Sequence, residues 1–160
     1  MAELSPLDEK LGEVLGLAQA AQVVAKQVRG MEGADAFASD LERMEREAGD
    51  VEQRTDALVD GLEGRKTAIR EKARETKGEA TEMAETYLGD EEEALDGFEF
   101  LSMAEAGELC HWEIVERIAS RTGEDDVARL AGTVLPTQRK HIDTVRTAYL
   151  ALADEEAREG

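Results

Sequence analysis

The chain has 160 residues, enough for one domain with a buried core, and its formal net charge is −19. An acidic field of this size disfavours nucleic acid and anionic membrane surfaces as partners, because both repel a negatively charged protein. The single cysteine, Cys110, excludes an internal disulfide, an iron–sulfur cluster and a zinc-finger framework.

The beginning of the sequence, MAELSPLDEK, has neither the basic nor the apolar segment that marks a signal peptide. No apolar run approaches the roughly 18 residues needed to cross a bilayer. We therefore expect a cytoplasmic protein that does not enter a membrane.

Helix is favoured throughout, because Ala, Glu, Leu, Arg and Met dominate and no strand-length stretch alternates polar and apolar residues. A first helix is predicted over 6–30, with Ser5 as its N-cap and Pro6 at its first position. A second helix is predicted over 35–63, where apolar residues recur at spacings of three and four.

Residues 65–88 are helical by propensity but mostly charged. Their apolar stripe is thin, and it includes Ala80, Met83 and Tyr87. A helix this polar is typical of a solvated connector that lies across a bundle.

Two longer helices complete the chain, predicted over 93–122 and 124–155 and separated by a turn at Gly123. Pro136 lies inside the last helix, where we expect a kink and no break, and we expect the acidic tail to fray. These segments predict a single all-α domain over 1–160, a four-helix bundle of two antiparallel pairs joined by a polar helical crossover connector.

Each of the last two helices carries one polar pair inside an otherwise apolar face. Glu108 and His111 are the only polar members of the inner stripe of the fourth helix, and Gln138 and His141 hold the same place in the fifth. Residues three apart lie on one face of a helix, so each pair points in one direction. The short turn makes the two helices antiparallel neighbours, which places the pairs within a turn or two of each other.

Together the two pairs offer a carboxylate, two imidazoles and an amide, a suitable ligand set for a first-row transition metal such as iron or manganese. A metal ion would also offset the cost of burying an unpaired glutamate. The second helix adds Glu45, and the centre of the first adds Gln22 or Gln19. The pattern predicts a mono- or dinuclear metal site with the following candidate ligands: Glu108, His111, His141, Gln138, Glu45 and Gln22.

Other interpretations stay open at this point. The polar residues can form a buried, metal-free hydrogen-bond network, which would suit a non-enzymatic helical stress or scaffold protein. The helices can also be rotated differently from the assumed face. A bis-histidine haem site at His111 and His141 would need a larger cavity than the apolar stripes predict. The exposed apolar remainder of the first two helices offers a surface for a homodimer.

The stretch 105–145 resembles the second helical pair of the ferritin-like superfamily. It is most similar to a small group of bacterial ferritin-like proteins linked to stress responses, whose HYE-type motif resembles His111-Trp112-Glu113 ahead of the helix end at Gly123. The resemblance implies a four-helix bundle with Glu and Glu-x-x-His ligands at its middle, and chemistry on oxygen or peroxide.

Carried onto this chain, the resemblance assigns the two polar pairs to the third and fourth core helices, with Gln138 in place of the family's glutamate. Glu45 is the best match on the second core helix, where the expected histidine is missing. The first core helix offers Gln19 or Gln22 in place of a glutamate. These departures argue against a complete di-iron oxidase site and for one metal ion, a weak pair or a remnant.

Overall fold

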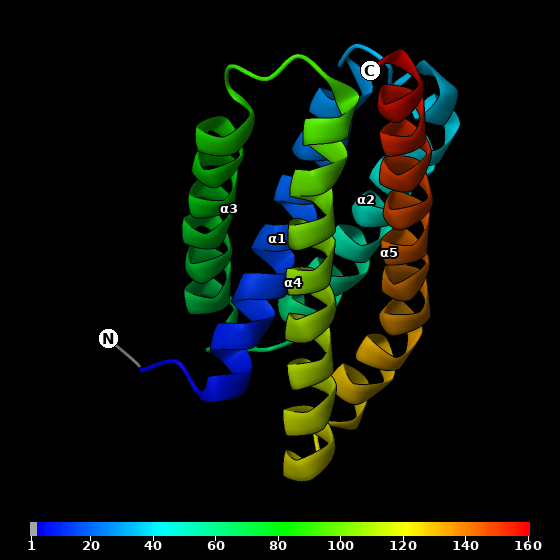
Figure 1. Ribbon diagram of the computed structural model, residues 1–160. Helices are drawn as coiled ribbons and strands as arrows, with labels where there is room; N and C mark the ends of the chain where they lie inside the picture. The colour runs from blue at the N-terminus through cyan, green and yellow to red at the C-terminus, as the bar shows by residue number, and fades with distance from the viewer. Residues whose placement is uncertain (1–2) are drawn as a thin grey trace.

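The computed structural model describes residues 3–160 as a helical bundle with a short 3₁₀ turn at Asp35–Phe37 (Figure 1). No helix within this range is both long and apolar enough to cross a membrane. The predicted all-α class is confirmed, and the α-helices have these bounds: α1 Pro6–Arg29, α2 Ala38–Asp60, α3 Lys66–Leu88, α4 Ala94–Thr122 and α5 Asp125–Glu159.

The last helix differs most from its predicted bounds. α5 runs without a break through Pro136 and on to Glu159, so the predicted fraying of the acidic tail is wrong. Its last ten residues are mostly Ala, Leu, Glu and Arg, all strong helix formers, and this propensity outweighs the local excess of acidic residues. Figure 1 shows the first turns of α5 inclined to the rest of the helix.

Four helices form the bundle, and the fifth lies outside it. α4 packs along α5, α1 packs against both α2 and α4, and α2 contacts α5. Figure 1 shows the chain ascending α1, descending α2, ascending α3, descending α4 and ascending α5. α3 is therefore the crossover that returns the chain to the end of the bundle where α4 begins.

α3 packs closely on α1, although its composition predicts a solvated connector. A Cβ atom added at Gly12 would lie 2.8 Å from the carbonyl oxygen of Ile69, and one at Gly16 would lie 2.9 Å from the Cβ of Thr76. Glycine has no Cβ, so these two positions allow the helices to approach this closely. The stripe that α3 buries consists of Ile69, Ala73, Ala84 and Leu88, while Met83 and Tyr87 stay exposed.

The core is divided along the bundle axis. One apolar cluster includes Phe98, near the start of α4, and the other includes Trp112, in its second half. Between them lies a layer of buried polar side chains, which we call the polar waist: Glu105, Glu108, Gln138 and His141.

Specific contacts hold the ends of the bundle together. At one end the guanidinium group of Arg65 donates to the carboxylates of Asp8 and Glu124, which joins the start of α1 to the α2–α3 and α4–α5 turns. At the other end Glu32 exchanges backbone hydrogen bonds with the α3–α4 loop. These contacts fix the positions of α4 and α5 along the bundle axis relative to α1. They therefore also fix where the polar waist lies along that axis.

Candidate functional site

Glu105 is the centre of the polar waist, although the sequence pattern did not single it out. The residue is 3% exposed. The side-chain amide of Gln138 donates to its carboxylate and, at 3.1 Å, to its backbone carbonyl. Nδ1 of His141 lies 3.4 Å from the same carboxylate oxygen. One acidic residue of α4 thus contacts both members of the polar pair on α5.

His141 connects three helices. Its Nδ1 faces Glu105 on α4, and its Nε2 lies 3.2 Å from Oε1 of Glu47 on α2. Both ring nitrogens face carboxylates, so both act as donors when the ring is an imidazolium. Burial alone lowers the pKa of His141, but the hydrogen bonds and charges of Glu105 and Glu47 outweigh it and raise the pKa above its ordinary value.

Glu108 lies one turn further along α4 and has different surroundings. It is 7% exposed, yet none of the hydrogen bonds or ion pairs found within residues 3–160 uses its carboxyl group. Burial raises the pKa of Glu108 well above its ordinary value, and the neighbouring Glu105 raises it further. Glu108 therefore stays neutral at pH values where an exposed glutamate is ionised.

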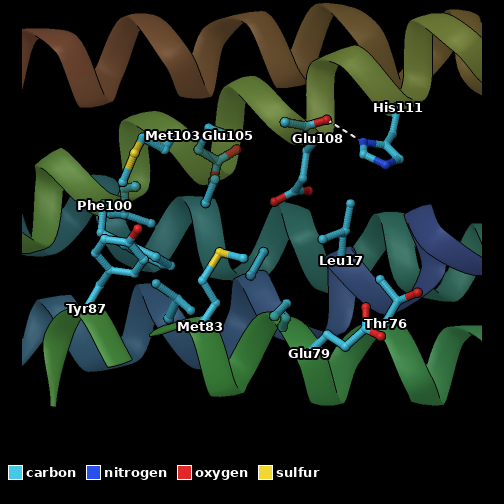
Figure 2. Close-up of a pocket in the computed structure, with 17 residues that line it drawn as sticks. Leu17, Thr76, Glu79, Met83, Tyr87, Phe100, Met103, Glu105, Glu108 and His111 are labelled. Atoms are coloured by element: carbon cyan, nitrogen blue, oxygen red, sulfur yellow. Dashed lines mark hydrogen bonds between the residues drawn. The ribbon is translucent and has the colours of Figure 1, made fainter. Parts of the chain in front are cut away.

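Figure 2 shows where the Glu108 side chain points, which is into a pocket between α1, α3 and α4. The pocket has a volume of about 320 Å³ and mainly apolar walls. Its lining includes three carboxyl side chains, those of Glu79, Glu105 and Glu108, and among the described residues that line it there is no lysine or arginine. His111 and Thr76 add polar groups at the end occupied by Glu108.

His111 lies outside the polar waist, with 30% of its side chain exposed. Its Nδ1 is 2.7 Å from the carbonyl oxygen of Gly107, the interaction dashed in Figure 2, and its Nε2 is 2.8 Å from Oε2 of Glu13 on α1. The side chain that continues the buried face of α4 is Trp112. The inner stripe predicted for α4 was therefore wrong by one residue, which corresponds to a rotation of about 100° about the helix axis.

Glu45 and Gln22, the two candidates on the first helical pair, make contacts between α1 and α2 and do not reach the polar waist. Glu45 accepts a hydrogen bond from Arg29 at 2.9 Å. Gln22 donates to Oε1 of Glu52 at 2.8 Å and to the carbonyl of Ala18 at 3.1 Å. Of the six predicted ligands, the structure gathers three in the buried layer, Glu108, Gln138 and His141, and leaves the other three in separate contacts.

In this arrangement the donor groups do not fit a metal ion. A metal needs a nitrogen lone pair, whereas both ring nitrogens of His141 are directed at carboxylates. The amide of Gln138 presents its NH₂ group to Glu105. Within residues 3–160, no three or more His, Cys, Asp or Glu side chains are placed to hold a metal ion. Nor do His111 and His141 form an axial pair for haem, since they face Glu13 on α1 and Glu47 on α2.

Glu105 and Glu47 are the two functional candidates that the sequence pattern missed. Glu105 lies three residues before Glu108, so a search for i, i+3 acidic pairs on the inner face of α4 would have found it. Glu47 is one of many acids on α2 and has no comparable signal. A scan of protein-family models and searches of curated proteins and of solved structures find no match to this chain.

Proposed function

We propose that the chain is a non-enzymatic helical scaffold of ferritin-like layout whose polar waist holds protons in place of metal ions. The observation that carries this proposal is the position of His141, whose ring nitrogens face Glu105 and Glu47 on two other helices. A histidine that binds a metal directs one nitrogen to the ion and donates from the other. Here the imidazolium itself supplies the positive charge that the buried carboxylate needs.

The layout supports the ferritin-like part of the proposal. Two antiparallel pairs, α1 with α2 and α4 with α5, are connected by the crossover helix α3, which packs on α1. The polar residues of α4 and α5 meet at mid-height, where bundles of this kind place their ligands. The resemblance of 105–145 to bacterial stress-associated proteins makes a cytoplasmic, stress-related role part of the same proposal.

The proposed role of the polar waist is to specify how the helices pair. Two apolar clusters alone allow a helix to slide by a turn at little cost, because one aliphatic contact resembles another. Glu105 pairs only with the level of α5 that carries Gln138 and His141, and His141 pairs only with the level of α2 that carries Glu47. Buried polar groups act in this way in some helical assemblies.

Metal analysis provides the main test. The protein is purified without chelator, dialysed anaerobically against Mn²⁺ or Fe²⁺, and analysed by plasma mass spectrometry beside His141→Ala and, as a control outside the polar waist, His111→Ala. We expect less than one metal ion per chain and the same value in all three proteins. Stoichiometric metal that is lost in His141→Ala and kept in His111→Ala would overturn the proposal.

A second measurement tests the protonation directly. Nitrogen-15 NMR distinguishes an imidazolium from a neutral ring, because only the neutral ring has an unprotonated nitrogen. We expect both ring nitrogens of His141 to keep their protons to a higher pH than an ordinary histidine does, since its pKa is raised. A His141 ring that loses its proton at or below the ordinary pKa of histidine would contradict the proposal even if no metal binds.

A further inference from the structure

The pocket between α1, α3 and α4 has the form of a small-molecule site. α3 is held against α1 by the glycine contacts and touches α4 much less, so a gap remains between α3 and α4. Apolar side chains from all three helices line that gap (Figure 2), among them Leu17, Val24, Met83, Tyr87, Phe100 and Met103. The volume of about 320 Å³ lies at the lower end of the range for ligand pockets, roughly 300–1,000 Å³.

The rim of this pocket is unusually apolar for a protein surface. Met83, Tyr87 and Met103 are 55%, 58% and 56% exposed, and all three line the same pocket. Single exposed apolar side chains are common, but a group of them around one hollow indicates a binding site. The rings of Tyr87 and Phe100 lie with their centroids 5.9 Å apart and form one wall.

At the inner end of the pocket lies the Glu108 carboxyl group, which has no hydrogen-bond or ion-pair partner within residues 3–160. It is more than nine-tenths buried, and Figure 2 shows its carboxyl group directed into the pocket. Among the described residues no fully enclosed side-chain oxygen lacks a partner, so the Glu108 oxygens are accessible from the pocket and a ligand that enters it can hydrogen-bond to them. This group is distinct from Glu105, whose carboxylate already contacts Gln138 and His141.

The charges decide which ligand fits. The exposed acidic side chain of Glu79 and the net charge of −19 disfavour an anion such as a fatty acid. An amine is attracted by the same charges, and its ammonium group can donate hydrogen bonds to Glu108, which releases its proton to solvent when the cation binds beside it. The apolar walls favour a cation that carries a hydrocarbon part.

We propose that this pocket binds a small amphiphilic amine, with the ammonium group against Glu108 and the hydrocarbon part between Met83, Tyr87 and Phe100. A volume of 320 Å³ corresponds to about ten water-sized volumes, so the ligand is a short-chain or single-ring amine and not a lipid. The site does not depend on the absence of a metal ion from the polar waist, because Glu108 takes no part in the contacts of His141.

Calorimetric titration of the full chain with matched probes tests the chemistry of the site. n-Octylamine carries both charge and chain, n-octanol only the chain, methylamine only the charge, and octanoate the chain with the opposite charge. We expect octylamine to bind at least about tenfold more tightly than any of the other three, which is the effect of one charge-assisted hydrogen bond. Binding of octanol or octanoate as tight as that of octylamine, or no binding of octylamine, would overturn the proposal.

Two variants of α4 test the role of Glu108. Glu108→Gln keeps the size of the side chain and removes its capacity for negative charge, and Glu113→Gln makes the same change on the exposed side of the helix. We expect octylamine to bind about tenfold more weakly to Glu108→Gln, with octanol unaffected, and no change in Glu113→Gln. An unchanged octylamine affinity in Glu108→Gln would assign the binding to surface acids and overturn the site.

A third variant locates the ligand. Ala80→Trp places a large side chain on the pocket wall from the outer helix α3, where the residue is partly exposed and the substitution can be accommodated. We expect loss of octylamine and octanol binding with an unchanged circular dichroism spectrum. Full binding to a folded Ala80→Trp protein would show that the amine binds elsewhere.

Discussion

Glu105 and Glu108 are three residues apart on one face of α4, and both are buried, yet the structure gives them different chemistry. Glu105 faces α5, accepts a hydrogen bond from Gln138 and contacts His141. Glu108 faces the pocket beside α3, where no side chain of residues 3–160 donates to it. The comparison shows that two acids of one type and similar burial differ in their surroundings, because one has hydrogen-bonding partners on the neighbouring helix and the other faces a pocket.

The difference between the two glutamates originates in how their neighbours are packed. α5 lies along α4 for most of its length and brings an amide and an imidazole into reach of Glu105. α3 is drawn toward α1 by close contacts at Gly12 and Gly16, which leaves space between α3 and α4. Glycine positions on α1 therefore determine the environment of a glutamate on α4.

The largest expected effect comes from removing the partner of Glu105. His141→Leu leaves the Glu105 carboxylate buried, with the neutral amide of Gln138 still donating to it but without the imidazolium. Breaking a buried ion pair in this way lowers the free energy of unfolding by about 3–5 kcal/mol. Urea denaturation measures the loss. The double variant Glu105→Leu/His141→Leu should regain most of it, because it leaves no buried charge and Glu47 is one-third exposed. A single variant as stable as the parent would contradict the charged network.

The next effect distinguishes the pocket beside α3 from the polar waist. Gly16→Leu forces a side chain into the contact with Ala73 and Thr76, and overpacking of this kind costs about 1–3 kcal/mol. We expect α3 to move away from α1 and the pocket to change, while the waist contacts of Glu105 remain intact. Urea denaturation gives the stability, and the ¹⁵N signals of His141 report the waist. A changed protonation state of His141 would show that the two regions are coupled.

The sequence predicted most of the fold because the fold depends on local signals. The cap at Ser5, the turn at Gly123 and the spacing of apolar residues place the helices within a few residues of their observed bounds. The class of α3 was harder to predict. Many residues of α3 are charged and its buried apolar stripe is narrow. That stripe packs against two glycines of α1, Gly12 and Gly16.

The site was predicted in part, and the reason is geometric. Two stripes on α4 satisfy the same helical spacing: one has Ala104 and His111 facing inward, and the other has Glu105 and Trp112. The sequence gives both, and only the packing of α5 and α1 selects the second. Burial of Gln138 and His141 was predicted correctly because α5 has a single apolar stripe. The pocket could not be predicted, since it depends on how α3 docks.

The smallest expected effect concerns the pH dependence of stability at Glu108. Its pKa is raised in the folded state, so its contribution to stability is complete below the pKa of an unfolded glutamate, near 4.5, and is lost as the pH rises through the folded pKa. Glu108→Gln cannot ionise and lacks this loss. Relative to the parent, the variant should therefore become more stable with rising pH, by about 1.4 kcal/mol for each unit of the shift.

Urea midpoints of the parent, Glu108→Gln and the exposed control Glu113→Gln, taken between about pH 5 and about pH 8, measure this difference. His141 also has a raised pKa, so it too loses its contribution as the pH rises above its ordinary value, but it does so in all three proteins and cancels in the comparison. Repulsion among the acidic side chains also weakens at low pH in all three proteins, and this effect cancels in the same way. A parent-to-variant difference that stays constant with pH would mean that Glu108 is ionised in the folded protein, and that the two glutamates of α4 do not differ in charge.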